Sequence, residues 1–203
     1  MEGRAVFVRE QGVVVLGRGA RRVLFPLPRG ANAKDPVWSP DGASVAFAYA
    51  PPRPGSTPAT VPEPPTQAFA SDLMAVGADG SGARVLVAHD RPGVILDGPA
   101  WGPDGRTLYF GYYAPLYQGD SLAGAVSEIR RRDPWEIWSV GTAGGSPRRV
   151  TWLDEDSPGA AWSTDGRRLL VQGQGGVYIV DAATGAARRV SDSGAHGGVD
   201  WRE

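Results

Sequence analysis

The chain has 203 residues, of which 41% are hydrophobic and 21% charged, and its formal net charge is −1. This composition is typical of a soluble globular protein with a core, and so small a net charge excludes a general field that attracts nucleic acid or an anionic membrane. The absence of cysteine excludes disulfides, thiolate nucleophiles and cysteine-based metal sites. We therefore expect no nucleic-acid partner, no membrane partner and no cofactor.

The N-terminal residues contain no basic segment followed by an apolar one, which is the pattern of an export signal. The chain as written is therefore expected to be cytoplasmic, and a domain taken from an exported protein would have the same appearance.

Short apolar runs separated by glycine and proline fill the chain, and this pattern predicts an all-β protein. The first three predicted strands cover residues 4–9, 13–16 and 22–25. A motif of the form Trp-x-x-Asp-Gly then occurs three times. Its residues are Trp38, Asp41, Gly42, Trp101, Asp104, Gly105, Trp162, Asp165 and Gly166.

Each copy of the motif is followed by the same series of predicted strands. The next strands cover 44–49, 107–112 and 168–172, further strands cover 72–76, 136–140 and 176–180, and the last begin at 84, 149 and 189. The Asp-Gly pair predicts a tight turn, in which the carboxylate bonds the backbone and glycine adopts a left-handed conformation. The tryptophans are predicted to fill the space between neighbouring sheets.

The two ends of the chain complete this pattern when they are joined. Trp201 begins a fourth motif just before the chain stops, whereas the N-terminal strands have no motif before them. A strand from the C-terminus that closes an N-terminal sheet is how β-propellers remove their last free edge. The whole chain, residues 1–203, is therefore predicted to be one domain of four sheets with four antiparallel strands each.

The Trp-Ser-Pro-Asp-Gly sequence at Trp38, with looser copies at Trp101 and Trp162, resembles the TolB-like and WD-like propeller repeats of bacteria. This resemblance implies a β-propeller. With four repeats, the chain is predicted to form a four-bladed ring, or half of an eight-bladed ring in a homodimer.

Two insertions, at about residues 51–70 and 113–134, interrupt otherwise regular repeats and are predicted to lie over one mouth of the channel. The first is rich in proline. The second predicts a short helix with Leu122, Val126 and Ile129 on one face and Asp120 or Ser121 as its cap, which would act as a lid.

We predict that this face binds a protein or peptide partner and that the chain is not an enzyme. The candidate partner-binding residues are Tyr112, Tyr113, Tyr117, Arg130, Arg131, Arg132, Trp135, Asp97, Asp154 and Asp156. The aromatic residues would either line a pocket or only anchor the loop, and the arginines would either pair with the acidic residues or bind an anion. No catalytic or metal-binding residue is assigned.

Two alternatives remain open at this stage. Carboxylates at the channel mouth would suit a small-molecule or Ca²⁺-type ion site, although no segment has the acidic spacing of a calcium-binding loop. A minimal hydrolase would use these carboxylates with His89 or His196.

Overall fold

This computed structural model describes residues 4–17, 19–52, 70–90, 93–114, 135–153, 159–163, 165–173 and 175–192. The described residues form β-strands and no helix, so the prediction of an all-β chain is confirmed. Four antiparallel sheets are present: the first sheet (β1–β3), the second (β4–β7), the third (β8–β11) and the fourth (β12–β15). The predicted helix and lid lie outside the described residues, as does most of both insertions.

The strands of each sheet follow one another in chain order. In the first sheet they are β1 (Arg4–Arg9), β2 (Gly12–Gly17) and β3 (Ala20–Pro26). In the second they are β4 (Asn32–Trp38), β5 (Ser44–Ala50), β6 (Asp72–Gly77) and β7 (Arg84–Val87). In the third they are β8 (Ile95–Trp101), β9 (Thr107–Tyr113), β10 (Glu136–Gly141) and β11 (Arg148–Arg149). In the fourth they are β12 (Gly159–Trp162), β13 (Arg168–Gln172), β14 (Val177–Asp181) and β15 (Ala187–Ser191).

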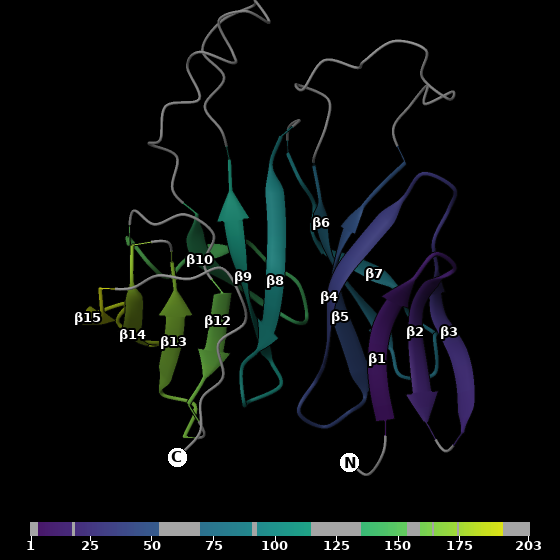
Figure 1. Cartoon of the computed structure of the whole chain (residues 1–203), viewed down its shortest axis with the longest axis horizontal. Coiled ribbons are helices and arrows are strands. Elements are labelled where there is room, and N and C mark those ends of the chain that lie inside the picture. The colour runs from purple at the N-terminus through teal and green to yellow at the C-terminus, as the bar shows by residue number, and fades with distance from the viewer. Residues whose placement is uncertain are drawn as a thin grey trace, which may run out of the picture.

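The sheets stand side by side in a row, with the first and fourth sheets at its two ends (Figure 1). Three apolar clusters fill the spaces between neighbours. Phe47 and Val13 belong to the cluster between the first and second sheets, Phe110 and Leu73 to the next, and Leu169 and Ile137 to the third. Burial of these apolar faces is what holds successive sheets together.

Each repeat tryptophan lies in the cluster between its own sheet and the preceding one. Trp38, Trp101 and Trp162 occupy the first, second and third clusters respectively. Trp101 Nε1 donates a hydrogen bond to the Val37 carbonyl at 3.2 Å, whereas Trp38 Nε1 and Trp162 Nε1 are buried without a hydrogen-bond partner among the described residues.

The Asp-Gly turns are alike in three sheets. Gly42, Gly105 and Gly166 all have φ between 63° and 69°. In each turn the preceding aspartate accepts a hydrogen bond from the backbone N–H two residues further on, at 2.9–3.0 Å. These bonds hold the link between the first and second strand of each four-stranded sheet.

The first sheet differs from the others because only three of its strands are described. Arg22 in β3 donates to the Asp79 carbonyl of the second sheet at 3.2 Å, and Arg84 in β7 donates in the same way to the Thr142 carbonyl of the third sheet at 3.1 Å. Because β7 is the fourth strand of its sheet, β3 corresponds to a fourth strand as well. The sheet therefore lacks its first strand within the described part of the chain. The segment predicted to supply it, which includes Trp201, lies outside the described residues, so ring closure and blade number stay predictions.

Candidate functional site

The two insertions leave their sheets at the same end, which we call the insertion face. Strands β5 and β9 end there, at Ala50 and Tyr113, and these residues pair with Asn32 and Ile95 at the beginnings of β4 and β8. The Ser71 N–H donates to the Val94 carbonyl at 3.0 Å and joins the second and third sheets at this end. The insertion face is therefore built on rigid strand ends of two neighbouring sheets.

A cavity of about 260 Å³ opens between these two sheets at the insertion face. Its walls are mostly small: Ala33, Ala48, Ala50 and Ala70 line it together with Asn32, Lys34, Ser71 and Ile95. Ser71 is buried and is not available to a ligand, because its hydroxyl donates to the Leu96 carbonyl and accepts from the Leu96 N–H, both at 2.8 Å. The space is thus mainly apolar, and Lys34 is its charged boundary.

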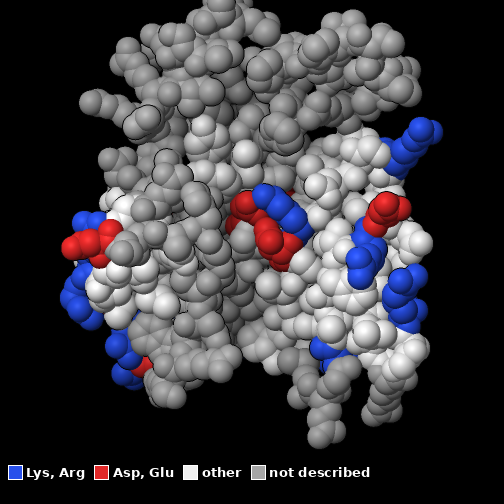
Figure 2. Space-filling model, viewed as in Figure 1, with Lys and Arg blue, Asp and Glu red and all other residues white. Residues whose placement is uncertain are grey.

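Three charged side chains meet at the bulges of β4 and β8. Lys34 forms an ion pair with Asp97, one of the predicted partner-binding residues. Asp35 lies beside them with φ 52°. Figure 2 shows acidic and basic side chains together near the centre of this view, over the first strands of the second and third sheets. Because two carboxylates lie beside one ammonium group, the cluster has a net negative charge when both carboxylates are ionised.

The pKa of Asp35 is raised to about 6. Partial burial is the main cause, and a hydrogen bond to Asp97 and the charge of that carboxylate add to it, while Lys34 and the Gly98 N–H act in the opposite direction. A carboxyl group that loses water and gains an acidic neighbour holds its proton to higher pH.

The predicted aromatic residues are divided between the two faces of the third sheet. Tyr113 stacks on Trp135, with ring centroids 5.3 Å apart and an angle of 22° between the planes. Trp135 lies against Gly111, where an added Cβ would be 3.2 Å from the indole ring. Tyr112 points to the other face and packs on Trp138 with centroids 4.8 Å apart. Tyr113 and Trp135 therefore form one unit, and Tyr112 joins the core between the second and third sheets.

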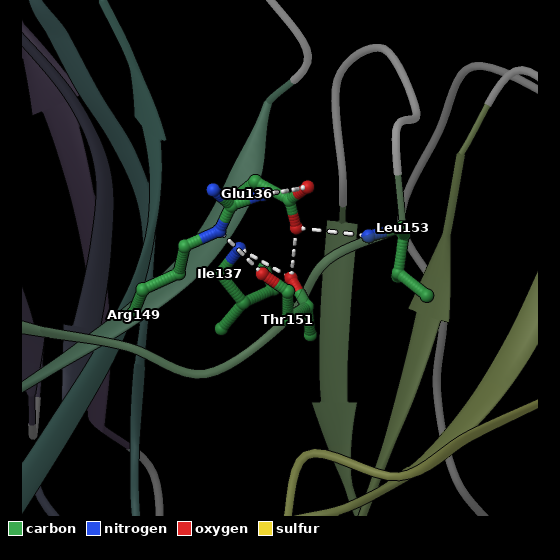
Figure 3. Close-up of polar contacts among 5 residues, drawn as sticks. All are labelled: Glu136, Ile137, Arg149, Thr151 and Leu153. Carbon is green, nitrogen blue, oxygen red and sulfur yellow. Dashed lines mark hydrogen bonds and ion pairs between the residues drawn. The ribbon is translucent and has the colours of Figure 1, made fainter.

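A buried carboxylate that sequence reasoning missed lies at the start of β10 (Figure 3). Glu136, whose side chain is 4% exposed, accepts from Arg149 at 2.6 Å, from the Thr151 hydroxyl at 2.5 Å and from the Leu153 N–H at 3.1 Å. The Thr151 hydroxyl in turn accepts from the Ile137 N–H at 2.9 Å. This network fixes the segment that follows β11.

An exposed tryptophan follows directly from this network. Trp152 is 66% exposed, and the Arg149 guanidinium lies 5.3 Å from its ring centroid. Arg149 is itself held by Glu136 and by the Thr151 carbonyl, to which it donates at 2.7 Å. The indole is therefore presented to solvent by a supported arginine.

The second sheet has a related contact at the same place in its repeat. Asp72 begins β6 and pairs across the strands with Tyr49, as Glu136 pairs with Tyr112. Asp72 accepts from the His89 N–H at 2.9 Å and contacts His89 Nδ1 at 2.6 Å. An acidic residue two positions after each insertion was the available sequence signal, because it recurs at the same point of two repeats.

The remaining predicted residues are outside the part of the chain that the structure describes. They are Tyr117, Arg130, Arg131, Arg132, Asp154, Asp156 and His196. The predicted pairing of the arginines with the acidic loop stays a prediction. Within the described ranges, no group of three or more histidine, aspartate or glutamate side chains has a geometry that could hold a metal ion, and no helix has the length and hydrophobicity needed to cross a bilayer.

No protein-family model and no curated protein matches the sequence, but solved structures do match the fold. TolB from Acinetobacter baumannii superposes with a TM-score of 0.60 at 16% identity, over 96% of this chain and 42% of that one. An oligogalacturonate lyase in complex with manganese gives 0.58 at 17% identity, over 89% and 42%. A puromycin hydrolase mutant complexed with PGG gives 0.63 at 23% identity, over 91% and 28%.

These similarities define the class of protein: the chain has a TolB-like β-propeller fold. It spans less than half the length of the three proteins above. The prediction that the chain is not an enzyme is contradicted, because structures with this fold include a lyase and a hydrolase. The sequence argument was wrong because a lack of known catalytic motifs was taken to exclude activity, whereas the fold itself carries different chemistries.

Proposed function

We propose that the insertion face binds a protein or peptide partner. The observation that carries this proposal is the stack of Tyr113 on Trp135 at the end of β9, with ring centroids 5.3 Å apart. Tryptophan, tyrosine and arginine are the residue types that contribute most to binding at interfaces. An indole whose position is already fixed loses little conformational freedom on binding.

The apolar cavity and the charged cluster suggest the chemistry of the partner. A volume of about 260 Å³ lined by alanines suits one apolar side chain. Beside it, Asp35 and Asp97 outnumber Lys34, so a basic neighbour on the partner is favoured over an acidic one. The proposed ligand is therefore a segment with an apolar side chain next to a basic residue.

Thermal unfolding of the full chain with synthetic hexapeptides tests this proposal. One set has a central leucine flanked by arginine and the other a central leucine flanked by glutamate. A ligand that binds the native state raises the melting temperature by mass action, so the arginine set is expected to raise it and the glutamate set is not.

Two variants locate the effect. Trp135→Ala is expected to remove the shift, and Val190→Ala, which truncates an apolar side chain that is 42% exposed on β15, is expected to retain it. The proposal fails if neither peptide set stabilises the chain, or if both variants respond alike.

A hydrolytic activity is a second candidate, favoured by the contact between His89 Nδ1 and Asp72 at 2.6 Å. A carboxylate that orients one ring nitrogen leaves the other to transfer a proton. Release of p-nitrophenol from p-nitrophenyl acetate by the full chain and by His89→Ala is the direct test. Equal rates for both, after subtraction of the rate without protein, would exclude this role for His89.

A further inference from the structure

Arginines bridge neighbouring sheets at the end opposite the insertions. Arg22, near the start of β3, donates to the carbonyls of Ala78 and Asp79 in the β6–β7 turn. Arg84, the first residue of β7, donates in the same way to the Thr142 carbonyl in the β10–β11 turn. Each bridge joins the fourth strand of one sheet to the turn before the fourth strand of the next.

The interface between the third and fourth sheets has an equivalent arginine, but that arginine does not form the bridge. Arg148 is the first residue of β11, and within the described part of the chain its guanidinium makes no hydrogen bond to the β14–β15 turn. The β14–β15 turn nevertheless packs closely against the third sheet, as the β6–β7 turn packs against the first sheet. An added Cβ at Gly80 would lie 3.3 Å from the Leu24 carbonyl oxygen, and one at Gly185 would lie 2.4 Å from the Val150 carbonyl oxygen.

A cavity of about 550 Å³ occupies the place of the missing bridge. It lies between the third and fourth sheets, and Arg148 from β11 and Arg167 from the β12–β13 turn both line it. Both arginines are exposed, and neither guanidinium has an ion pair or hydrogen bond in the described structure. Tyr109 and Trp162, whose rings meet edge to face with centroids 4.6 Å apart, supply an apolar wall.

The carboxylates in this cavity are already engaged by their own turns. Asp104 accepts from the Arg106 N–H at 2.9 Å and from the Thr107 N–H at 3.1 Å. Asp181 accepts from the Thr184 N–H at 2.8 Å and from the Ala183 N–H at 3.1 Å. Asp181 also accepts from the Thr184 hydroxyl at 2.8 Å, all three bonds being made through Oδ1, and Asp104 accepts from the Thr107 hydroxyl through Oδ2 at 3.1 Å, so each carboxylate is oriented by its own turn.

We infer that this inter-sheet cavity binds a small organic anion, whose carboxylate or phosphate group is held by Arg148 and Arg167. The planar guanidinium matches both groups with two parallel hydrogen bonds. The volume lies in the range of small-molecule sites, and the ring wall accommodates the body of the ligand. This site is separate from the insertion face, so it does not depend on the function proposed above.

Calorimetric titration of the full chain with inorganic phosphate, phenyl phosphate and benzoate tests the inference. Saturable binding of phenyl phosphate or benzoate is expected, and the preferred one identifies the anionic group. Inorganic phosphate is expected to bind more weakly because it has no body to contact Tyr109 and Trp162. Arg148→Met and Arg167→Met are each expected to weaken binding by roughly 10- to 100-fold, the usual effect of losing a hydrogen bond to a charged group.

Two further variants separate this site from general attraction of anions to arginine. Ala183→Phe fills the cavity without a change of charge and is expected to abolish binding. Arg188→Met removes an exposed arginine on β15, outside the cavity, and is expected to leave the affinity unchanged. The inference is overturned if none of the three probes binds saturably, if Ala183→Phe binds normally, or if Arg188→Met weakens binding as much as Arg148→Met.

Discussion

Asp35 has an unusual backbone conformation for its residue type. Among the described residues, Asp35 is the only one other than glycine with a positive φ. Asp35 stands three residues before Trp38, and Gly98, three residues before Trp101, has nearly the same φ, 51°. Register shifts occur at both places, in β4 and in β8. The repeat therefore requires a left-handed residue here, and aspartate tolerates that conformation better than most residues.

We predict that Asp35 makes stability depend on pH. Its pKa in the folded chain, about 6, is above the ordinary value of 3.8, so the folded state binds the proton more tightly and stability falls as pH rises from about 4 to about 6. Two pKa units correspond to about 3 kcal/mol at most. Because Asp35 is exposed by surface area, solvent screening reduces the expected loss to about 1 kcal/mol.

Urea unfolding of the native chain and of Asp35→Asn between pH 4 and 7 measures this effect. Asparagine keeps the tolerance for positive φ but does not titrate, so the variant is expected to lose the decline. The turn carboxylates Asp41, Asp79 and Asp165 have pKa values lowered mainly by serine hydroxyl hydrogen bonds, and their stabilising effect is lost below pH 4. Parallel curves for the two proteins between pH 4 and 6 would contradict the prediction.

At the scale of elements, the sequence predicts strands well and the contacts between them poorly. The strand predicted at 44–49 is β5, Ser44–Ala50, and the strand predicted at 168–172 coincides with β13. Alternation and turn residues are local signals, so they are visible in one sequence. The acidic contacts of Glu136 and Asp72 depend on which residues follow the fourth strands in space, and the division of Tyr112 from Tyr113 depends on strand register.

The turns of the third and fourth sheets give a matched pair of glycine substitutions. Gly105 and Gly166 have φ of 63° and 69°. An added Cβ at Gly105 would meet only Pro40 at 4.0 Å, whereas one at Gly166 would lie 2.2 Å from Pro103. Gly105→Ala is expected to cost about 1 kcal/mol for its backbone alone, and Gly166→Ala about 2 kcal/mol more because Pro103 must move. Thermal unfolding measures both, and equal losses would exclude the contact with Pro103.

Replacement of Glu136 is expected to destabilise the third sheet strongly. Glu136→Ala leaves the Thr151 hydroxyl and the Leu153 N–H without their acceptor and removes the partner of Arg149, which together cost about 3 kcal/mol. Urea unfolding and hydrogen exchange at Leu153 measure the loss. Asp181→Ala, which removes an exposed turn carboxylate, is the control and is expected to cost far less. A Leu153 amide that stays protected in Glu136→Ala would contradict this role.

In the molecule as a whole, β1 is an edge strand of the first sheet among the described residues. Strand β1 contacts β4 as β5 contacts β8, and the Arg22 bridge gives β3 the place of a fourth strand. β1 therefore corresponds to the second strand of the other sheets. In each of those sheets the second strand pairs with a first strand that ends in a tryptophan. Residues 195–201 contain glycine three positions before Trp201, as β8 contains Gly98 three positions before Trp101.

We predict that residues 195–201 supply the missing strand, from the same chain or from a second copy. Deletion of residues 193–203 is then expected to expose the amides of β1 that do not pair with β2, and hydrogen exchange of β1 measures this directly. Amides of β15, which pairs with β14 at the other end of the row, are the internal control. Light scattering separates the two sources, because a ring closed in one chain has a mass of 21.4 kDa and a two-chain ring has twice that mass. If hydrogen exchange of β1 is unchanged after the deletion, residues 195–201 do not pair with β1 and the prediction is wrong.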